Sequence, residues 1–169
     1  MIWVIAIPLL MLATLLQSAV LAQIQIFGGS LGLVLLMVLS WSILRPEEGL
    51  VWAALGGILS DLLSGGPFGG TAIAFVIASL AAGQIQGRLW GRHPLVIMAI
   101  ALLGTVISHL ASLALLGITG RPVDVGYALA YVTLPSAFFN TLFILPVYSL
   151  LSQLHHATLG KPEVSDFED

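Results

Sequence analysis

The stretch that decides the fold is residues 94–117, PLVIMAIALLGTVISHLASLALLG. It contains no Asp, Glu, Lys or Arg, and it is longer than the roughly 20 apolar residues that a helix needs to cross a lipid bilayer. Lipid tails accept such a surface, whereas water does not. The stretch therefore predicts a transmembrane helix.

The composition of the whole chain agrees with a membrane protein. Charged residues make up 8% of the 169 residues, against roughly 25% in a typical globular protein, and hydrophobic residues make up 59%. A water-soluble domain of this size could not cover its surface with so few charges. The absence of cysteine excludes disulfide and thiol chemistry. The net charge of -3 argues against a nucleic-acid partner, which would require a basic face.

Turn residues divide the chain into six apolar segments. At the sharpest boundary, Arg45-Pro46-Glu47-Glu48-Gly49, the proline cannot continue a helix and the two carboxylates suit the N-terminus of the next one. The expected fold is an all-α integral membrane bundle of six transmembrane helices in residues 1–152. An acidic tail, residues 153–169, has the composition of a disordered segment. The helices are expected near 2–22, 29–44, 49–64, 71–87, 94–117 and 126–151.

Basic residues predict the orientation of this bundle, because Lys and Arg are enriched in cytoplasmic loops. Arg45, Arg88, Arg92 and Lys161 fall on the side of the N-terminus, and Arg121 falls on the other side. Both termini are therefore expected in the cytoplasm. The first segment has no basic region before it, so we expect a retained span rather than a cleaved signal peptide. The turns at Arg45 and at 88–92 are either orientation signals or contacts for the cytoskeleton or anionic lipid.

Small residues recur at four-residue spacing in the third and fourth segments. Such ridges let helix backbones approach closely, so that dispersion contacts stabilise the helix pair within lipid. Two interpretations stay open: packing between helices of this chain, or a docking face for a partner's membrane helix. The residues are Ala74, Ala78 and Ala82, the adjacent Ser79, Gly83 and Gly87, and Gly57 with Ala53, Gly56 and Ser60.

Polar residues form a second pattern, with spacings of three, four and seven that place each set on one helix face. Because polar stripes that face lipid are costly, we expect them to turn inward and meet in the outer half of the bilayer. The predicted result is a polar centre or a cavity open to the outside. Its members are Gln17 and Ser18 with Thr14, Ser60 and Asp61 with Gly57 and Ser64, Ser108 and His109 with Thr105 and Ser112, and Ser136 and Asn140 with Thr133.

Asp61 is the only acidic residue placed inside a predicted span, and three interpretations of it remain open. It reaches interfacial water or caps the turn at 64–67, or it hydrogen-bonds His109 or Asn140, or it lines a ligand or proton site. A histidine such as His109, by itself, is typical of a satisfied interior side chain rather than of a ligand.

The motifs do not predict an enzyme. Gly28-Gly29-Ser30-Leu31-Gly32 matches G-x-S-x-G, but a nucleophile elbow needs a strand before it and a helix after it in a soluble sheet. The sequence has no carboxylate pair, phosphate-binding loop or Cys-x-x-Cys, and the doublet His155-His156 has no further metal ligands beside it. We therefore expect no catalytic residues, no metal and no cofactor.

The order of these segments resembles the bacterial rod shape-determining MreD family over residues 9–151. The most specific parts are Asp61-Leu62-Leu63-Ser64-Gly65-Gly66-Pro67-Phe68-Gly69 and Leu134-Pro135-Ser136, the latter followed by Asn140 and Pro146. Leu16-Gln17-Ser18 and the turn at Arg45-Pro46 add weaker support. One departure is Gly29-Ser30-Leu31, which stands where family members often begin the second span with Pro-Asp.

The resemblance implies a non-enzymatic scaffold of the cell-elongation complex in the bacterial inner membrane, which supports cell shape and lateral peptidoglycan synthesis. Its implied partner is MreC, a protein with one membrane helix, and more loosely the glycosyltransferase RodA, its transpeptidase partner PBP2 and MreB filaments. Membrane lipid and further copies of the chain are additional candidate partners. The family's six short helices also resemble the S-components of energy-coupling-factor (ECF) transporters. The alternative function is therefore a small-molecule-binding subunit of an ECF-type transporter.

Overall fold

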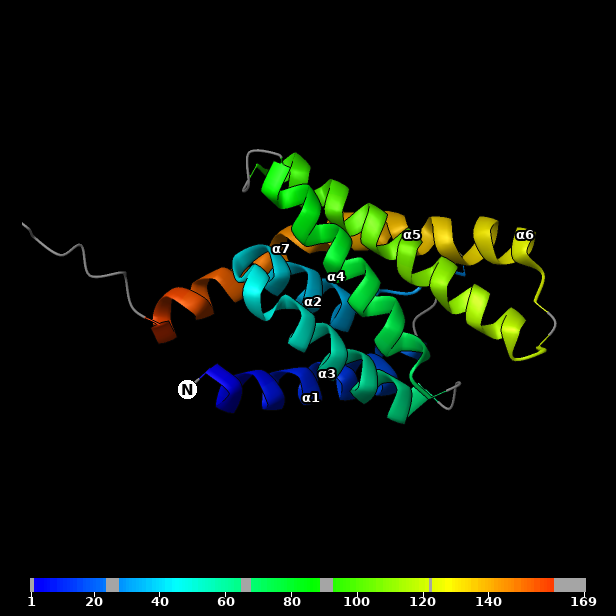
Figure 1. Ribbon diagram of the computed structural model, residues 1–169, viewed down its shortest axis with the longest axis horizontal. Coiled ribbons are helices and arrows are strands. Elements are labelled where there is room, and N and C mark those ends of the chain that lie inside the picture. The colour runs from blue at the N-terminus through cyan, green and yellow to red at the C-terminus, as the bar shows by residue number, and fades with distance from the viewer. Residues whose placement is uncertain (1, 24–27, 65–67, 89–92, 122, 160–169) are drawn as a thin grey trace, which may run out of the picture.

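The computed structural model describes residues 2–23, 28–64, 68–88, 93–121 and 123–159, and these residues are almost entirely helical (Figure 1). This confirms the all-α class. Each of the six predicted segments contains one main helix, of 12 residues in α2 and of 18 or more in the others. The elements are α1 (Ile2–Ala19), the 3-10 turn η1 (Leu21–Gln23), α2 (Leu33–Leu44), α3 (Pro46–Ser64), α4 (Gly70–Arg88), α5 (Pro94–Ile118), α6 (Val125–Tyr127), the π-helical η2 (Ala128–Thr133) and α7 (Leu134–Leu159).

The short helix α2 forms the centre of the molecule. Every residue from Val34 to Leu44 is buried, and α2 contacts α1, α3, α4, α5 and α7. Its 12 residues span about 18 Å, well short of the roughly 30 Å hydrocarbon layer of a bilayer. Because neighbours surround it, α2 needs no polar face, which explains why its sequence is apolar all round.

The start of α2 differs from the predicted start at residue 29, because residues 28–32 are not helical. Gly28 has φ +83°, a conformation that side chains beyond glycine rarely adopt. A Cβ on Gly29 would lie 2.6 Å from Cβ of Pro135 and 2.7 Å from the backbone N of Ser136. The segment thus passes directly against α7, and this contact between distant parts of the sequence replaces the first turn of the expected helix.

The last helix also differs from the expected single α-helix over 126–151. Elements α6, η2 and α7 are continuous, and the π-helical part ends just before Pro135. Proline has no N–H to donate to the carbonyl of Tyr131 four residues earlier, and its ring would clash with that carbonyl in a regular α-helix. The wider π turn accommodates both effects. At the other end α7 continues to Leu159, so residues 153–159, which we assigned to the tail, are helical, and 160–169 lie outside the described residues.

The α2–α3 turn follows the prediction except that α3 begins at Pro46 rather than at residue 49. The first helical position suits proline, since the N–H at that position has no partner within the helix. The helices α4 and α5 begin and end within one residue of their predicted limits.

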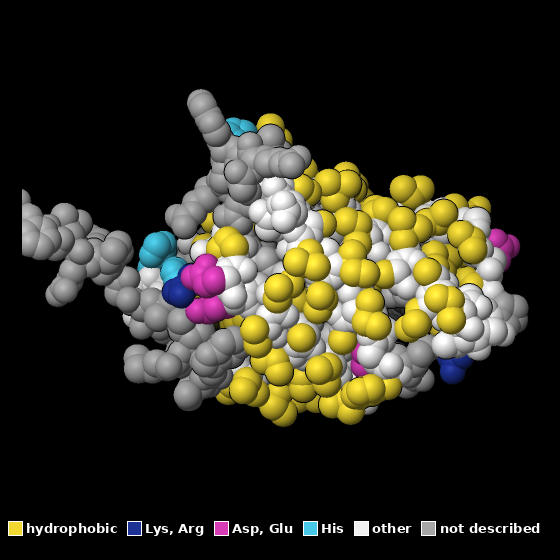
Figure 2. Space-filling model, viewed as in Figure 1, with side chains coloured by type: hydrophobic (Ala, Val, Ile, Leu, Met, Phe, Trp, Pro, Cys, Tyr) yellow, Lys and Arg dark blue, Asp and Glu magenta, His cyan; other side chains and the backbone are white. Residues whose placement is uncertain are grey.

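The outer surface of the bundle is apolar. Large hydrophobic side chains are exposed on every long helix except the central α2 among the described residues, and Figure 2 shows them covering the middle of one face, with acidic and basic side chains mostly toward the ends of the long axis. Two of the described helices, Pro94–Ile118 and Val125–Ala157, are long and apolar enough to cross a membrane. Shorter apolar helices, Ala6–Ala19, Leu33–Leu44 and Gly70–Ile85, accompany them.

Candidate functional site

Three polar side chains hold the non-helical segment that leads into α2. The first N–H groups of a helix have no partner within it, and an unpaired N–H is costly where water is absent. Side-chain oxygens on α1 and α7 accept hydrogen bonds from alternate N–H groups, from residue 30 to the start of α2. Ser30 N–H donates to Ser136 Oγ (3.0 Å), Gly32 N–H to Asn140 Oδ1 (2.9 Å) and Val34 N–H to Gln17 Oε1 (2.9 Å).

Asp61 likewise accepts backbone N–H groups at the start of α4. Its carboxylate is 5% exposed and accepts three backbone N–H groups, those of Gly69 (2.9 Å), Thr71 (2.9 Å) and Ala72 (3.3 Å). A carboxylate at a helix N-terminus is favoured both by these hydrogen bonds and by the helix dipole. Of the three interpretations of Asp61, the geometry matches a cap, although Asp61 caps the helix after the turn rather than the turn itself.

His109 and Asn140 have other partners than Asp61. Nδ1 of His109 lies 3.1 Å from the hydroxyl of Thr133 in η2, and Asn140 Nδ2 donates to Thr105 Oγ1 on α5 (3.0 Å). Asn140 is 1% exposed, and its amide links α7 to both α5 and the segment before α2. Both residues therefore connect helices, in keeping with the expectation of an interior histidine.

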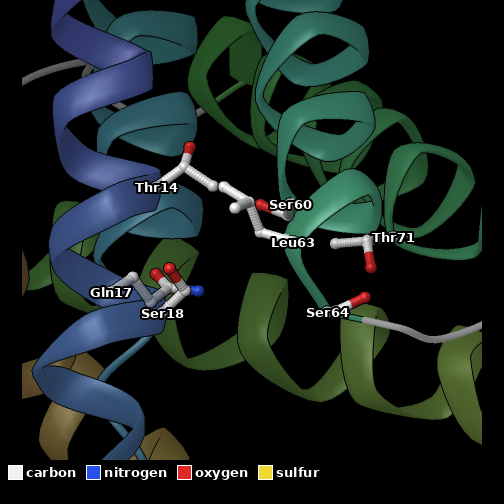
Figure 3. A pocket seen from close by; sticks show the side chains of 7 residues that line it. All are labelled: Thr14, Gln17, Ser18, Ser60, Leu63, Ser64 and Thr71. Atoms are coloured by element: carbon white, nitrogen blue, oxygen red, sulfur yellow. The ribbon is translucent and has the colours of Figure 1, made fainter.

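The polar residues surround two adjacent cavities at the end of the bundle that holds the α3–α4 turn. Their volumes are about 370 and 240 Å³. In the larger one, Figure 3 shows the side chains of α1 facing those of α3 and the start of α4; they are Thr14, Gln17, Ser18, Ser60, Leu63, Ser64 and Thr71. The second shares Gln17 and Thr71 with it and adds Ser30, Ser108, His109, Ser112 and Asn140, among others.

Two smaller cavities adjoin these. One of about 270 Å³ lies between α5 and η2 and shares His109 and Ser112 with the second cavity. The other, about 170 Å³, contains Asp61, Thr71 and, at its rim, Arg121. Seven of the eight residues of the predicted polar centre line these neighbouring cavities, and Ser136 lies beside them through its bond to Ser30.

The sequence reasoning missed Thr71, which lines three of these cavities. Thr71 has no polar neighbour three or four residues away on α4, so no stripe marks it. The only signal was its position directly after Gly69-Gly70, where a helix start exposes the side chains of the first turn toward the preceding turn.

The small residues of α3 and α4 mostly pack within the chain. Ala74, Ala78, Ala82 and Ser79 are at most 4% exposed, and the Ser79 hydroxyl lies 2.8 Å from that of Ser42 on α2. Gly57 lies against the backbone of Ala72, so these five residues are helix-packing positions that their own chain covers. Gly83 differs, because a Cβ added there would meet nothing within 4 Å. Gly87 has no side-chain surroundings that the structure describes.

The opposite end of the bundle carries an ionic turn. Arg45 pairs with Glu47 (2.6 Å) and Glu48 (3.1 Å), and Glu48 also accepts the indole N–H of Trp41, which stacks on Trp52. The hydrogen bond from its own backbone N–H, and then the Arg45 side chain, lower the pKa of the Glu47 carboxyl. The side chains of Arg88, Arg92 and Lys161 lie outside what the structure describes. Of the basic residues in the predicted cytoplasmic turns and tail, Arg45 is therefore the one whose contacts are described.

Thr105 on α5 and Thr141 on α7 allow a matched test of the hydrogen bond between Asn140 and Thr105. Thr105→Val removes the acceptor of Asn140 Nδ2 and leaves a buried donor unpaired, which costs about 1–3 kcal/mol. The buried Thr141 hydroxyl has no hydrogen-bond partner among the described residues, so Thr141→Val should leave stability unchanged or raise it. Chemical unfolding of both variants in detergent micelles measures the difference. Equal losses for the two variants would show that the Asn140–Thr105 contact contributes nothing.

Comparison with known families assigns the chain. Residues 1–154 match the family of the rod shape-determining protein MreD. No curated protein and no solved structure matches the chain. The match covers helices α1 to α6, most of α7 and all the cavity residues described above, and the family consists of membrane proteins that act in shape determination. The chain therefore belongs to the MreD family of rod shape-determining membrane proteins.

Proposed function

We propose that this chain is a non-enzymatic scaffold of the bacterial inner membrane that holds the membrane helix of MreC and, through it, supports lateral peptidoglycan synthesis. The family is a structural component of rod shape determination, and the structure adds an apolar outer surface with Gly83 as an open small-residue position on α4. RodA, PBP2 and MreB would act beside this pair in the elongation complex. The match to this family favours the scaffold over the transporter subunit as the function of the whole chain.

The proposed arrangement crosses the membrane six times with both termini in the cytoplasm. Figure 1 shows the start of α1, the α2–α3 turn and the end of α7 toward one end of the long axis, and the ends of α3 and α5 toward the other. Arg45 lies at the first end and Arg121 at the second. Basic residues favour the cytoplasmic side, so the predicted excess of Arg and Lys on the side of the N-terminus supports an arrangement with the cavities on the outer side.

Gly83 carries the proposal for the docking face. It lies on α4 beside a row of exposed apolar side chains, Ile73, Ile77 and Leu80, and among the described residues no atom of another element lies within 4 Å of the position of a Cβ. Within lipid, a small residue on an apolar face lets a second helix approach closely and gain dispersion contacts. The buried alanines of the same helix cannot serve this purpose, since α2, α3 and α5 already pack around α4.

Replacing Gly83 with leucine tests docking without disturbing the fold. We expect Gly83→Leu to lower the amount of MreC that co-purifies from membranes by about tenfold, because loss of a close helix contact of about 1.4 kcal/mol changes binding by that factor. Gly117→Leu is the matched control: Gly117 lies on α5, also with no atom within 4 Å of a Cβ. Undiminished MreC with Gly83→Leu, at unchanged melting temperature, would remove this face as the docking surface.

A further inference from the structure

Most of the hydroxyl groups that line the two larger cavities can accept a hydrogen bond from a ligand but cannot donate one. A backbone carbonyl can only accept a hydrogen bond, so a hydroxyl bonded to one donates its single proton there. Six of the hydroxyls that line these cavities are bonded in this way to carbonyls of their own helix, which leaves only their lone pairs for the cavity. The bonds are Thr14 to Leu10 (2.6 Å), Ser18 to Leu15 (3.2 Å), Ser60 to Gly56 (2.8 Å), Ser64 to Asp61 (3.4 Å), Ser108 to Thr105 (3.0 Å) and Ser112 to Ser108 (2.9 Å).

The amide of Gln17 supplies the complementary group. Its Oε1 already accepts the N–H of Val34, so the amide nitrogen, with two N–H donors, remains for the cavities that Gln17 lines. Thr71, whose hydroxyl lines both cavities, offers one further group that can donate or accept. Phe75 contributes an aromatic surface to the second cavity.

The cavities lack charge. Among the described residues that line the two larger ones there is no Asp, Glu, Lys or Arg. The nearest carboxylate, Asp61, lines only a smaller neighbouring cavity and already accepts three backbone N–H groups. An ammonium ligand would lose its hydration in these cavities without gaining a partner of opposite charge, and a carboxylate would meet only the His109 imidazole, whose Nδ1 already contacts Thr133, so both are disfavoured.

We propose that these adjoining cavities bind a small uncharged polyhydroxy compound, of the sugar or polyol class, from the outer side of the membrane, a side that rests on the orientation proposed above. The ligand's hydroxyls donate to the serine and threonine oxygens, and the Gln17 amide donates to one ligand oxygen. The larger cavity, about 370 Å³, lies within the roughly 300–1,000 Å³ typical of ligand pockets, and the second, about 240 Å³, adjoins it. This site is separate from the α4 face around Gly83, so it can be tested independently of MreC.

Saturation-transfer NMR on the full chain in lipid nanodiscs tests this site. The probes are D-glucose, D-galactose and myo-inositol, with protonated D-glucosamine and D-gluconate as charged counterparts. We expect transfer to at least one uncharged probe, weaker transfer to both charged ones, and a loss of about tenfold in Thr71→Leu, which fills the cavity and removes hydrogen bonds. The side chain of Thr71 takes no part in the Asp61 cap, which uses its backbone N–H, so the fold should remain intact.

The control is Thr119→Leu, at the exposed end of α5 and outside the residues that line these cavities. It should bind the uncharged probe as the wild type does. Absence of transfer to all three uncharged probes, stronger transfer to a charged counterpart, or equal transfer in Thr71→Leu would each overturn the proposal.

Discussion

Replacing Gly57 with alanine is expected to destabilise the protein by about 3 kcal/mol or more, a large part of the roughly 5–15 kcal/mol by which folded proteins are typically stable. A Cβ at this position of α3 would overlap the Cα of Ala72 and lie 2.6 Å from its backbone N. The obstacle is backbone, which cannot rotate away as a side chain could. It is also fixed, because Asp61 accepts the N–H of Ala72 and so ties the start of α4 to α3.

Gly83→Ala is the matched control for this change. It introduces the same methyl group into the neighbouring helix α4, where the Cβ meets nothing within 4 Å. Alanine is favoured over glycine in a helix interior by about 1 kcal/mol, so this variant should be as stable as the wild type or more stable. The melting temperature in detergent, followed by size-exclusion chromatography, compares the two. If the Gly57→Ala protein has the same melting temperature as the Gly83→Ala protein, α3 and α4 are not in backbone contact.

Asp61→Ala is expected to cost about 3 kcal/mol or more, because three part-buried backbone N–H groups lose the buried carboxylate that accepts them. Hydrogen bonds to a charged group are worth about 1.5–3 kcal/mol each, and the N–H groups left behind lie at the start of a helix, where no helix carbonyl can replace the acceptor. Asp61→Asn keeps one acceptor oxygen and should fall between the wild type and Asp61→Ala. Unfolding in a denaturant series gives all three free energies.

Asp124 provides the comparison for Asp61. It also caps a helix, accepting the N–H of Tyr127 (3.0 Å), but it is exposed and accepts this single N–H. Asp124→Ala should therefore cost about 1 kcal/mol, the usual value for an N-cap. If the two alanine variants lose the same stability, the Asp61 carboxylate acts as an ordinary surface cap rather than as the anchor between α3 and α4.

The sequence predicted the features that depend on local pattern. Apolar segments of the right length gave the helices. Spacings of three, four and seven placed Ser60 and Asp61 on one face with Gly57 and Ser64, and Ser108 and His109 on one face with Thr105 and Ser112. Stripes that avoid lipid must face inward, which is why these residues could be expected in one region. The limits of α4 and α5 followed from glycine and proline, whose conformational effects are local.

Features that depend on distant contacts could not be predicted. Residues 29–32 stood at the start of the predicted helix 29–44, but Ser136 and Asn140, more than a hundred residues later, hold this segment in another conformation. The four-residue spacing of small residues shows that a ridge exists, not which way it faces. Ala78 is 1% exposed, whereas Gly83, five residues later on the same helix, is open. Only the packing of the whole bundle distinguishes them.

The central claim is that the bundle lies across the membrane with its polar cavities outside and the end of α7 inside. The chain has no cysteine, so single cysteines can be labelled without background. Ser64 lines the larger cavity, and Gln153 is exposed near the end of α7. The test uses cells whose outer envelope is permeabilised and whose inner membrane is intact. A membrane-impermeant maleimide should label Ser64→Cys in these cells and should reach Gln153→Cys only after the inner membrane is opened. Labelling of Gln153→Cys from outside, with Ser64→Cys protected, would contradict the account.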